Sequence, residues 1–235
     1  MGSPGHGDFV LKRGEAPPRD GWAWGVVRLG VLWCVVVVLG FPGVGWGQND
    51  PAHQQFLFAY KLLQRGEDRL AAEAFDEYLG RFPNAPKTGD ARYYQALLHR
   101  RTGEGERALE LLREAPEPML VPGHAVTLLH GQVLSDLERY GAAAAVLEGI
   151  DVGSLEAGAR APAWYLRGLA HRGAGNLAAA AADLGAAAGV EGPLRARAWV
   201  DLARVQRLRG EVDAALATLE RARAEAVGPV AADAV

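Results

Sequence analysis

A helix-pair pattern repeats five times along this chain. A turn residue stands inside each repeat, and it is glycine at positions 66, 103, 175 and 210 and glutamate at position 138. Successive turns are 37, 35, 37 and 35 residues apart. A period in this range is typical of a helical solenoid, whose units bury their apolar faces only against their neighbours. The period therefore predicts an all-α chain that acts by presenting a surface to a partner.

Small and large residues recur at fixed distances from these turns. Seven residues before each turn stands a small residue: Ala59, Ala96, Gly131, Gly168 and Ala203. Five residues after it stands Ala71, Ala108, Ala143, Ala180 or Ala215, and nine residues after it stands Phe75, Leu112, Leu147, Leu184 or Leu219. Two antiparallel helices approach closely only where one side lacks bulk, and the large residue fills the remaining space. The turn residue supplies the positive φ that ends the first helix.

These residues resemble the consensus of the tetratricopeptide repeat family. The first repeat, FAYKLLQRGEDRLAAEAFDEYLGRFPNAP, matches best, and Trp164 and Trp199 add the family's tryptophan in the last two repeats. The turn at Glu138 departs from the consensus, as do Tyr78 in place of a small residue and three polar residues at an apolar position, His99, His171 and Gln206. The resemblance covers about residues 52–229, and it implies a right-handed solenoid of about ten antiparallel helices.

The repeats are expected near residues 52–85, 89–122, 124–157, 161–194 and 196–229, followed by a tail at 230–235. Asp50 and Pro51 are expected to open the first helix as N-cap and first helical residue. Prolines at 116, 118 and 122 predict a flexible joint over residues 115–123, and residues 150–160 are expected to be a link before a helix that begins at Pro162.

The N-terminal segment has the layout of an export signal. Residues 1–28 form a basic leader that is expected to be disordered, and an apolar run from Leu29 to Phe41 follows it. Gly45-Trp46-Gly47 then supplies small residues for cleavage, so a cleaved signal peptide is the first interpretation. The alternative is an uncleaved anchor, because residues 29–47 lack charge and are just long enough to span a bilayer. Both interpretations place the repeats on the periplasmic side of the inner membrane.

Composition excludes several classes of protein. The chain has 235 residues, of which 49% are apolar and 23% are charged, as is normal for a folded domain. A net charge of −3 gives no basic bias toward nucleic acid. The single cysteine, Cys34, lies inside the apolar run, so a cleaved chain holds neither disulfide nor thiolate metal site.

No motif for catalysis appears. The sequence has no nucleophile motif and no HExxH, and Gly103-Glu104-Gly105 and Gly173-Ala174-Gly175 stand in inter-helix turns rather than after strands. The six histidines are scattered without a ligand spacing. We therefore expect no catalytic residue, no cofactor and no metal.

The resemblance implies that the first helix of each repeat lines an inner groove. The candidate groove residues are aromatic toward the N-terminus and arginine-rich toward the C-terminus: Phe56, Tyr60, Tyr93, Leu97, Arg100, Arg101, Tyr165, Leu169, Arg172, Arg197, Arg204 and Arg207. Aromatic residues with arginine are typical of binding hot spots, and such a groove suits a peptide with apolar anchors and acidic groups. The alternative is that the aromatics pack between repeats and that the arginines are solvated.

The sequence thus predicts a non-enzymatic scaffold for protein–protein interaction, exported to the bacterial cell envelope. The partner is a protein or peptide of unknown identity, and the membrane is touched only through the N-terminal segment. A structural module is the alternative, because no polar capping helix follows the last repeat and its apolar face could stack on another copy or chain. An enzyme is the alternative that the sequence supports least.

Overall fold

A computed structural model describes residues 50–115 and 117–227 of the chain. These residues belong to one compact unit, Trp46–Val235, and form ten α-helices, one short 3₁₀ helix and no strand. The first helices of the five pairs are α2 (Pro51–Gln64), α4 (Thr88–Arg101), α6 (Gly123–Asp136), α8 (Ala157–Gly173) and α10 (Arg195–Leu208). The second helices are α3 (Asp68–Arg81), α5 (Gly105–Glu114), α7 (Tyr140–Glu148), α9 (Leu177–Gly189) and α11 (Val212–Val227), and η1 (Val152–Ser154) precedes α8.

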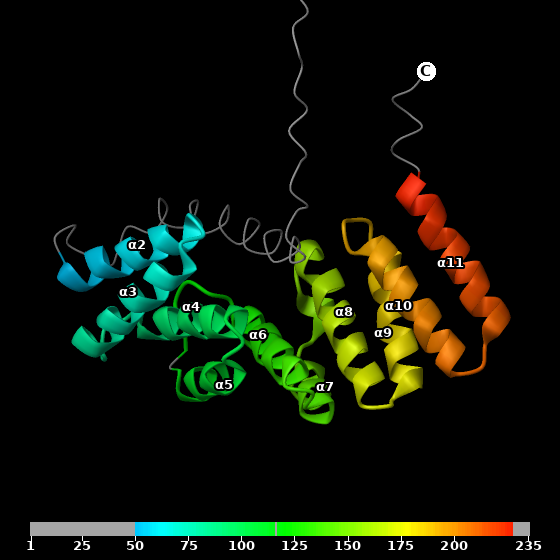
Figure 1. Cartoon of the computed structure of the whole chain (residues 1–235), viewed down its shortest axis with the longest axis horizontal. Helices are drawn as coiled ribbons and strands as arrows, with labels where there is room; N and C mark the ends of the chain where they lie inside the picture. Colours follow the sequence, from blue (N-terminus) through cyan, green and yellow to red (C-terminus); the bar gives the residue numbers. More distant parts are fainter. Residues whose placement is uncertain (1–49, 116, 228–235) are drawn as a thin grey trace, which may run out of the picture. The chain divides into compact units, whose positions relative to one another are not determined.

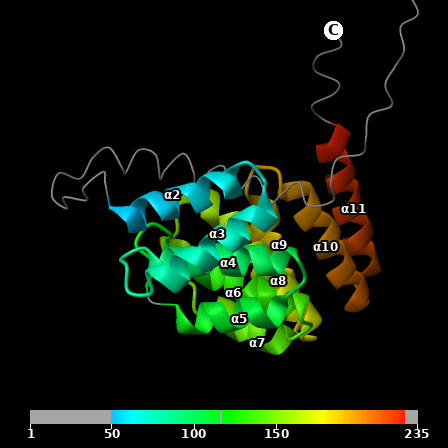
Figure 2. The same cartoon turned by 60° about the vertical axis from the view of Figure 1, so that its left-hand side comes forward.

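Each helix packs against the helix that follows it, from α2 to α11, as Figures 1 and 2 show from two sides. First helices also contact one another, α4 with α6, α6 with α8 and α8 with α10. The contact between α5 and α6 is the least extensive between successive helices. The predicted all-α solenoid of five helix pairs is confirmed.

All five predicted turn residues have a positive φ, including Glu138 at 58°. Each turn closes with the two hydrogen bonds of a Schellman motif. At Gly66, for example, the N–H of Glu67 donates to the carbonyl of Leu62 at 3.1 Å, and the N–H of Gly66 donates to the carbonyl of Leu63 at 3.0 Å. The regular period in the sequence therefore corresponds to one repeated hydrogen-bonding motif.

In the third and fourth repeats the small residue before the turn lies directly against the large residue after it. A Cβ on Gly131 would stand 2.5 Å from Cγ of Leu147, and one on Gly168 would stand 2.8 Å from Cγ of Leu184. Both leucines are at most 1% exposed. The large residue thus fills the space beside the small residue of its own repeat, and close helix approach depends on the missing side chain.

The first helix begins as the sequence predicts. Oδ1 of Asp50 accepts a 3.0 Å hydrogen bond from the N–H of Ala52, and Pro51 is the first helical residue. The fourth pair begins earlier than predicted. The helix α8 starts at Ala157 and carries Pro162 inside, because the segment AGARA is itself helix-forming and the guanidinium of Arg160 holds the carbonyls of Leu155 and Gly153.

The proline segment between α5 and α6 is held by a buried carboxylate. Asp90 of α4 is 0% exposed and accepts hydrogen bonds from the N–H groups of Met119, Leu120 and Val121, at 3.2, 2.8 and 3.0 Å. Residues 119–121 are thus held against α4. The prolines, from which a flexible joint was expected, give no sign of this anchoring.

The expected leader and cleavage site, residues 1–47, lie outside the described residues, as does the expected tail at 230–235. Among the residues that are described, no helix combines the length and the apolar character needed to cross a membrane.

Candidate partner-binding site

Five of the candidate groove residues line one pocket at the C-terminal end of the stack. The pocket has a volume of about 630 Å³ and lies between α8, α10 and α11. Its predicted members are Tyr165, Leu169, Arg172, Arg197 and Arg204. We call it the arginine pocket, because Arg223 of α11 adds a fourth guanidinium to the three that were predicted.

Helical periodicity explains why these side chains meet. On α10, Arg197, Asp201 and Arg204 are four and three residues apart and so share one face of the helix. On α8, Tyr165 and Leu169 are four residues apart and face α10 in the same way. Neighbouring first helices in a solenoid thereby place equivalent faces side by side, and the pocket spans two of them.

Asp201 organises the polar side of the pocket. Its carboxylate is 6% exposed and accepts a 2.7 Å hydrogen bond from the hydroxyl of Tyr165. It also accepts 2.8 Å hydrogen bonds from the guanidinium groups of Arg172 and Arg204. Because this aspartate joins two helices and fixes two arginines, the cationic groups are held in place before any ligand arrives.

Burial raises the pKa of the Tyr165 hydroxyl, and the hydrogen bond to Asp201 raises it further. Tyr165 therefore stays protonated and remains a donor to the carboxylate. The guanidinium of Arg197 lies over the Tyr165 ring, with Cζ 5.8 Å from the ring centroid. The ring face of Tyr165 thus contacts Arg197. Its hydroxyl binds Asp201, the carboxylate that holds Arg172 and Arg204.

The pocket presents more positive than negative charge. Its lining has four arginines and one carboxylate, and that carboxylate is already shared by Arg172 and Arg204. Arg223 is exposed and forms no ion pair with any described residue. Leu169, Val200 and Leu219 supply apolar lining beside these charges. Such a site favours a ligand that carries a carboxylate next to an apolar group.

Sequence reasoning missed six lining residues: Ala196, Val200, Asp201, Leu219, Ala222 and Arg223. Asp201 was detectable, because it stands four residues after Arg197 and three before Arg204 on the same helix. The α11 residues were missed because second helices were not expected to line the groove. Leu219, Ala222 and Arg223 nevertheless line the pocket from α11.

The aromatic residues of the first repeat follow the packing alternative. Phe56 is 2% exposed, and its ring lies 5.9 Å from that of Phe75 and 5.7 Å from that of Tyr78. The expectation that Phe56 faces a partner is therefore wrong, because four rings surround it, including Tyr94 at 6.3 Å. Tyr60 is partly buried against the same cluster, stacked on Phe56 at 6.3 Å. Tyr78 fills the space that a small residue would leave.

The candidates on α4 are engaged with neighbouring helices. Arg100 donates to Asp136 of α6 at 2.6 Å, and Arg101 donates to Asp68 of α3 at 2.9 Å. Tyr93 and Leu97 are partly buried, and burial raises the pKa of the Tyr93 hydroxyl to about 12, against the opposing effect of the two arginines. These arginines join repeats to one another, which the sequence pattern alone does not distinguish from a solvated face.

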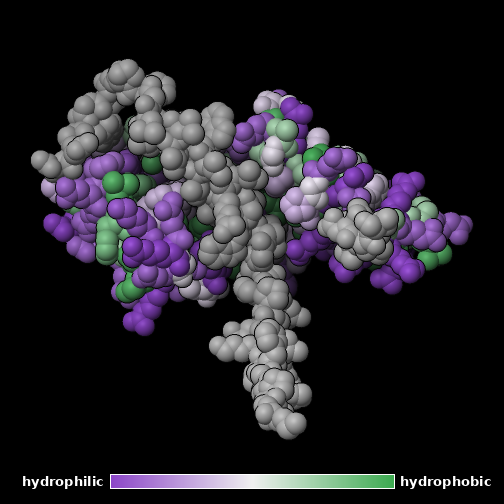
Figure 3. All heavy atoms as spheres, turned by 90° about the horizontal axis from the view of Figure 1, so that it is seen from above, coloured by the Kyte–Doolittle hydropathy of each residue, from purple (hydrophilic) through white to green (hydrophobic). Residues whose placement is uncertain are grey.

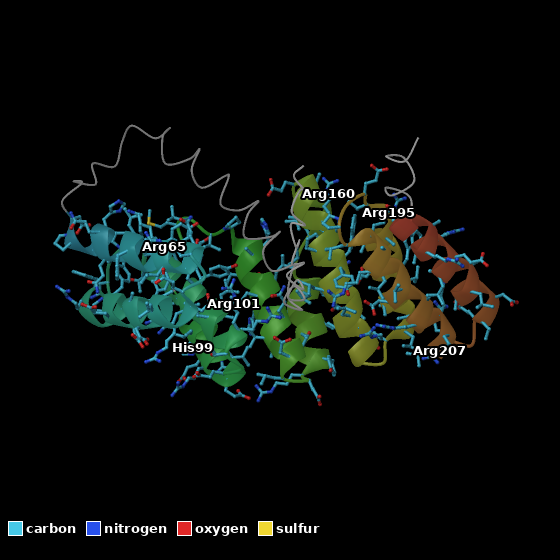
Figure 4. The ribbon with its side chains drawn as sticks, turned by 45° about the horizontal axis from the view of Figure 1, so that its top comes forward. Arg65, His99, Arg101, Arg160, Arg195 and Arg207 are labelled. Atoms are coloured by element: carbon cyan, nitrogen blue, oxygen red, sulfur yellow. The ribbon has the colours of Figure 1, made fainter. Side chains whose placement is uncertain are left out.

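Arg207 lies outside the arginine pocket. It stands near the C-terminal end of α10, beside the turn into α11, where Figure 4 labels it. Among the described residues no three His, Cys, Asp or Glu side chains come together as a metal site would require.

A family model of the tetratricopeptide repeat matches residues 56–118 and 165–231 of the chain. No curated protein matches this chain in sequence. Several solved structures are similar in fold. One is MamA 41-end from Desulfovibrio magneticus RS-1, which is 22% identical, with a TM-score of 0.64 over 75% of this chain and 96% of that chain.

Another similar structure is YrrB, described as a tetratricopeptide repeat protein with an unusual peptide-binding site. It is 18% identical, with a TM-score of 0.60 over 74% of this chain and 86% of that chain. At these identities the likeness concerns the fold.

Proposed function

The chain belongs to the tetratricopeptide repeat family, and from this premise we propose that it is a non-enzymatic scaffold that binds an acidic peptide segment of a partner protein in the arginine pocket. The observation that carries the proposal is the convergence of four arginines from three helices around one concave site. A protein that used these residues only for solubility would not need to gather them in a hollow.

The chemistry of the pocket defines the peptide. A guanidinium offers a planar fork of donors that suits a carboxylate, so the arginines of the pocket are the groups that would hold an Asp or Glu side chain, with Arg197 and Arg223 lining it from α10 and α11. Leu169 and Leu219 would receive a large apolar side chain close to that carboxylate. The fold supports the same role, because the similar protein YrrB carries a peptide-binding site.

A peptide-display experiment tests this proposal. A random library of 12-residue peptides is selected against the chain and then against the double variant Arg197→Glu and Arg223→Glu. We expect the selected peptides to carry Asp or Glu near a large apolar residue and to lose at least tenfold in affinity for the variant.

The control is Arg69→Glu, which reverses the charge of one arginine whose side chain is 91% exposed on α3, away from the pocket, and each pocket substitution is also compared with it singly. Circular dichroism checks that both variants stay helical. Selected peptides without acidic residues, or with equal affinity for the pocket variant, would refute the proposal.

We also propose that the chain is exported to the cell envelope. The support is the order of basic residues, apolar run and small-residue site over residues 1–47. Residues 1–60 fused to an enzyme that is active only outside the cytoplasm should give activity. Replacing Val35 and Val37 by Arg should abolish it, since charge in the apolar run blocks insertion. The N-terminal sequence of the recovered protein then distinguishes cleavage near Gly47 from a retained anchor.

A further inference from the structure

The last helix carries an apolar stripe that no described residue covers. Val212, Leu216 and Leu219 stand at helical spacing along α11 and are 57%, 57% and 43% exposed. Leu208, at the end of α10 and four residues before Val212 in the sequence, is 58% exposed. Hydrophobic surface is also visible in Figure 3 at the end of the molecule where Figure 1 places α11. Together with Arg207, these four side chains form what we call the end face.

The preceding repeat shows what covers such a stripe. Its equivalent positions on α9 are Leu177, Ala181 and Leu184. They pack in one cluster with Ala198, Leu202 and Val205, which all belong to the next first helix, α10. As a result Leu184 is 0% exposed, whereas its equivalent Leu219 is 43% exposed. The end face is thus shaped to receive one more first helix.

Arginines show what charge that helix would carry. Arg100, Arg172 and Arg207 each stand three residues before the turn of their repeat. Arg100 binds Asp136 and Arg172 binds Asp201, and both carboxylates belong to the next first helix. Arg207 is exposed and has no ion pair among the described residues. A carboxylate on an incoming helix would form with Arg207 the ion pair that Asp136 forms with Arg100 and Asp201 forms with Arg172.

We propose that the end face binds an amphipathic α-helix of another protein, with an apolar stripe and an Asp or Glu placed against Arg207. A second copy of the chain fits this surface less well. The helix that another copy would offer is α2, PAHQQFLFAYKLLQ, which contains no acidic residue and one lysine. The proposal goes beyond the arginine pocket, because only Leu219 belongs to both surfaces.

The chain itself supplies a probe helix. A synthetic peptide of residues 123–137 reproduces α6, which follows the α4–α5 pair and gives Asp136 to Arg100. The peptide is titrated into the isotopically labelled protein while the amide signals are followed by nuclear magnetic resonance. We expect shifts at residues 207–219. We also expect at least tenfold weaker binding to Leu216→Asp, since a leucine that the bound helix would cover is replaced by a charge.

The ion pair is tested by a double-mutant cycle. The Asp136→Asn peptide should bind about threefold more weakly, as for an exposed pair, and Arg207→Asp in the protein should be rescued by Asp136→Arg in the peptide. Leu70→Asp is the matched control, because Leu70 is 49% exposed on α3 and lies on neither proposed surface. The selected acidic peptides of the pocket experiment should bind Leu216→Asp normally, so the two proposals fail separately.

Three results would overturn the inference. The peptide shifts could fall outside the end face or survive Leu216→Asp. The protein could form a concentration-dependent dimer that Leu216→Asp abolishes in sedimentation experiments, and a second copy would then be the occupant. Removal of residues 228–235 could by itself shift the signals of Leu216 and Leu219, in which case the chain's own C-terminal segment occupies the face.

Discussion

Oδ1 of Asp90 accepts a 2.8 Å hydrogen bond from the backbone N–H of Leu120, which is 30 residues further along the chain. The N–H groups of Met119 and Val121 bind the same carboxylate. A single buried side chain therefore holds residues 119–121 of the proline segment against α4.

Replacing Asp90 by alanine should lower the free energy of unfolding by about 3 kcal/mol, because three backbone N–H groups lose the buried carboxylate that accepts them. Asp90→Asn keeps one acceptor oxygen and should lose roughly half as much. Chemical denaturation followed by circular dichroism measures both. Asp213→Ala is the control, because Asp213 is an exposed residue of α11. Its loss of unfolding free energy should stay within about 0.5 kcal/mol. A similar small loss for Asp90→Ala would contradict the assigned role.

The stability difference between the chain and Asp90→Asn should depend on pH. Burial raises the pKa of Asp90 above its ordinary value, although the three N–H groups and Lys87 oppose this. A raised folded pKa means that the native state binds the proton more tightly, so stability is lost as pH rises through that value. Leu120 and Val121 both bind Oδ1, so Oδ2 can take the proton at the expense of the Met119 bond alone.

The native chain should therefore gain stability relative to Asp90→Asn as the pH falls from 7 toward the ordinary aspartate pKa of about 4. Melting temperatures of both proteins measured at several pH values provide the test. A difference that shrinks on acidification would show that the hydrogen bonds outweigh burial.

Gly168→Ala should destabilise the fourth repeat by about 1–3 kcal/mol, because the new methyl would overlap the buried side chain of Leu184. Gly185→Ala is the matched control. Gly185 lies inside α9 with no atom within 4 Å of a new Cβ, so the same change should add about 0.5–1 kcal/mol of helix stability. Thermal unfolding of the two variants should shift in opposite directions, and equal shifts would reject the close approach of α8 and α9.

Glu138→Gly should stabilise the chain by about 1 kcal/mol, because Glu138 adopts a left-handed φ of 58° that a side chain disfavours. Glu138→Ala keeps the Cβ and should give no such gain. Denaturant midpoints of the two variants separate the backbone effect from the loss of the carboxylate. A stabilised alanine variant would instead assign the effect to charge.

The sequence alone predicts the repeat architecture because each repeat uses local rules. Turn residues with positive φ, small residues under large ones and an N-cap at Asp50 act within one helix pair, so their spacing is visible along the chain. The candidate arginines were also named from sequence, but their partners were not. Whether Arg100 binds Asp136 or Arg172 binds Asp201 depends on how adjacent first helices pack.

Phe56 and Arg197 both stand on first helices. Only the tertiary structure shows that Phe56 is surrounded by four rings whereas Arg197 lines a pocket. The same holds for Leu184 and Leu219, which occupy equivalent positions but differ in exposure, because among the described residues only Leu184 is covered by a following helix. The sequence thus determined the repeating unit, since its signals come from neighbouring residues. The packing between units decided which side chains are left for a partner, since that depends on contacts between distant parts of the chain.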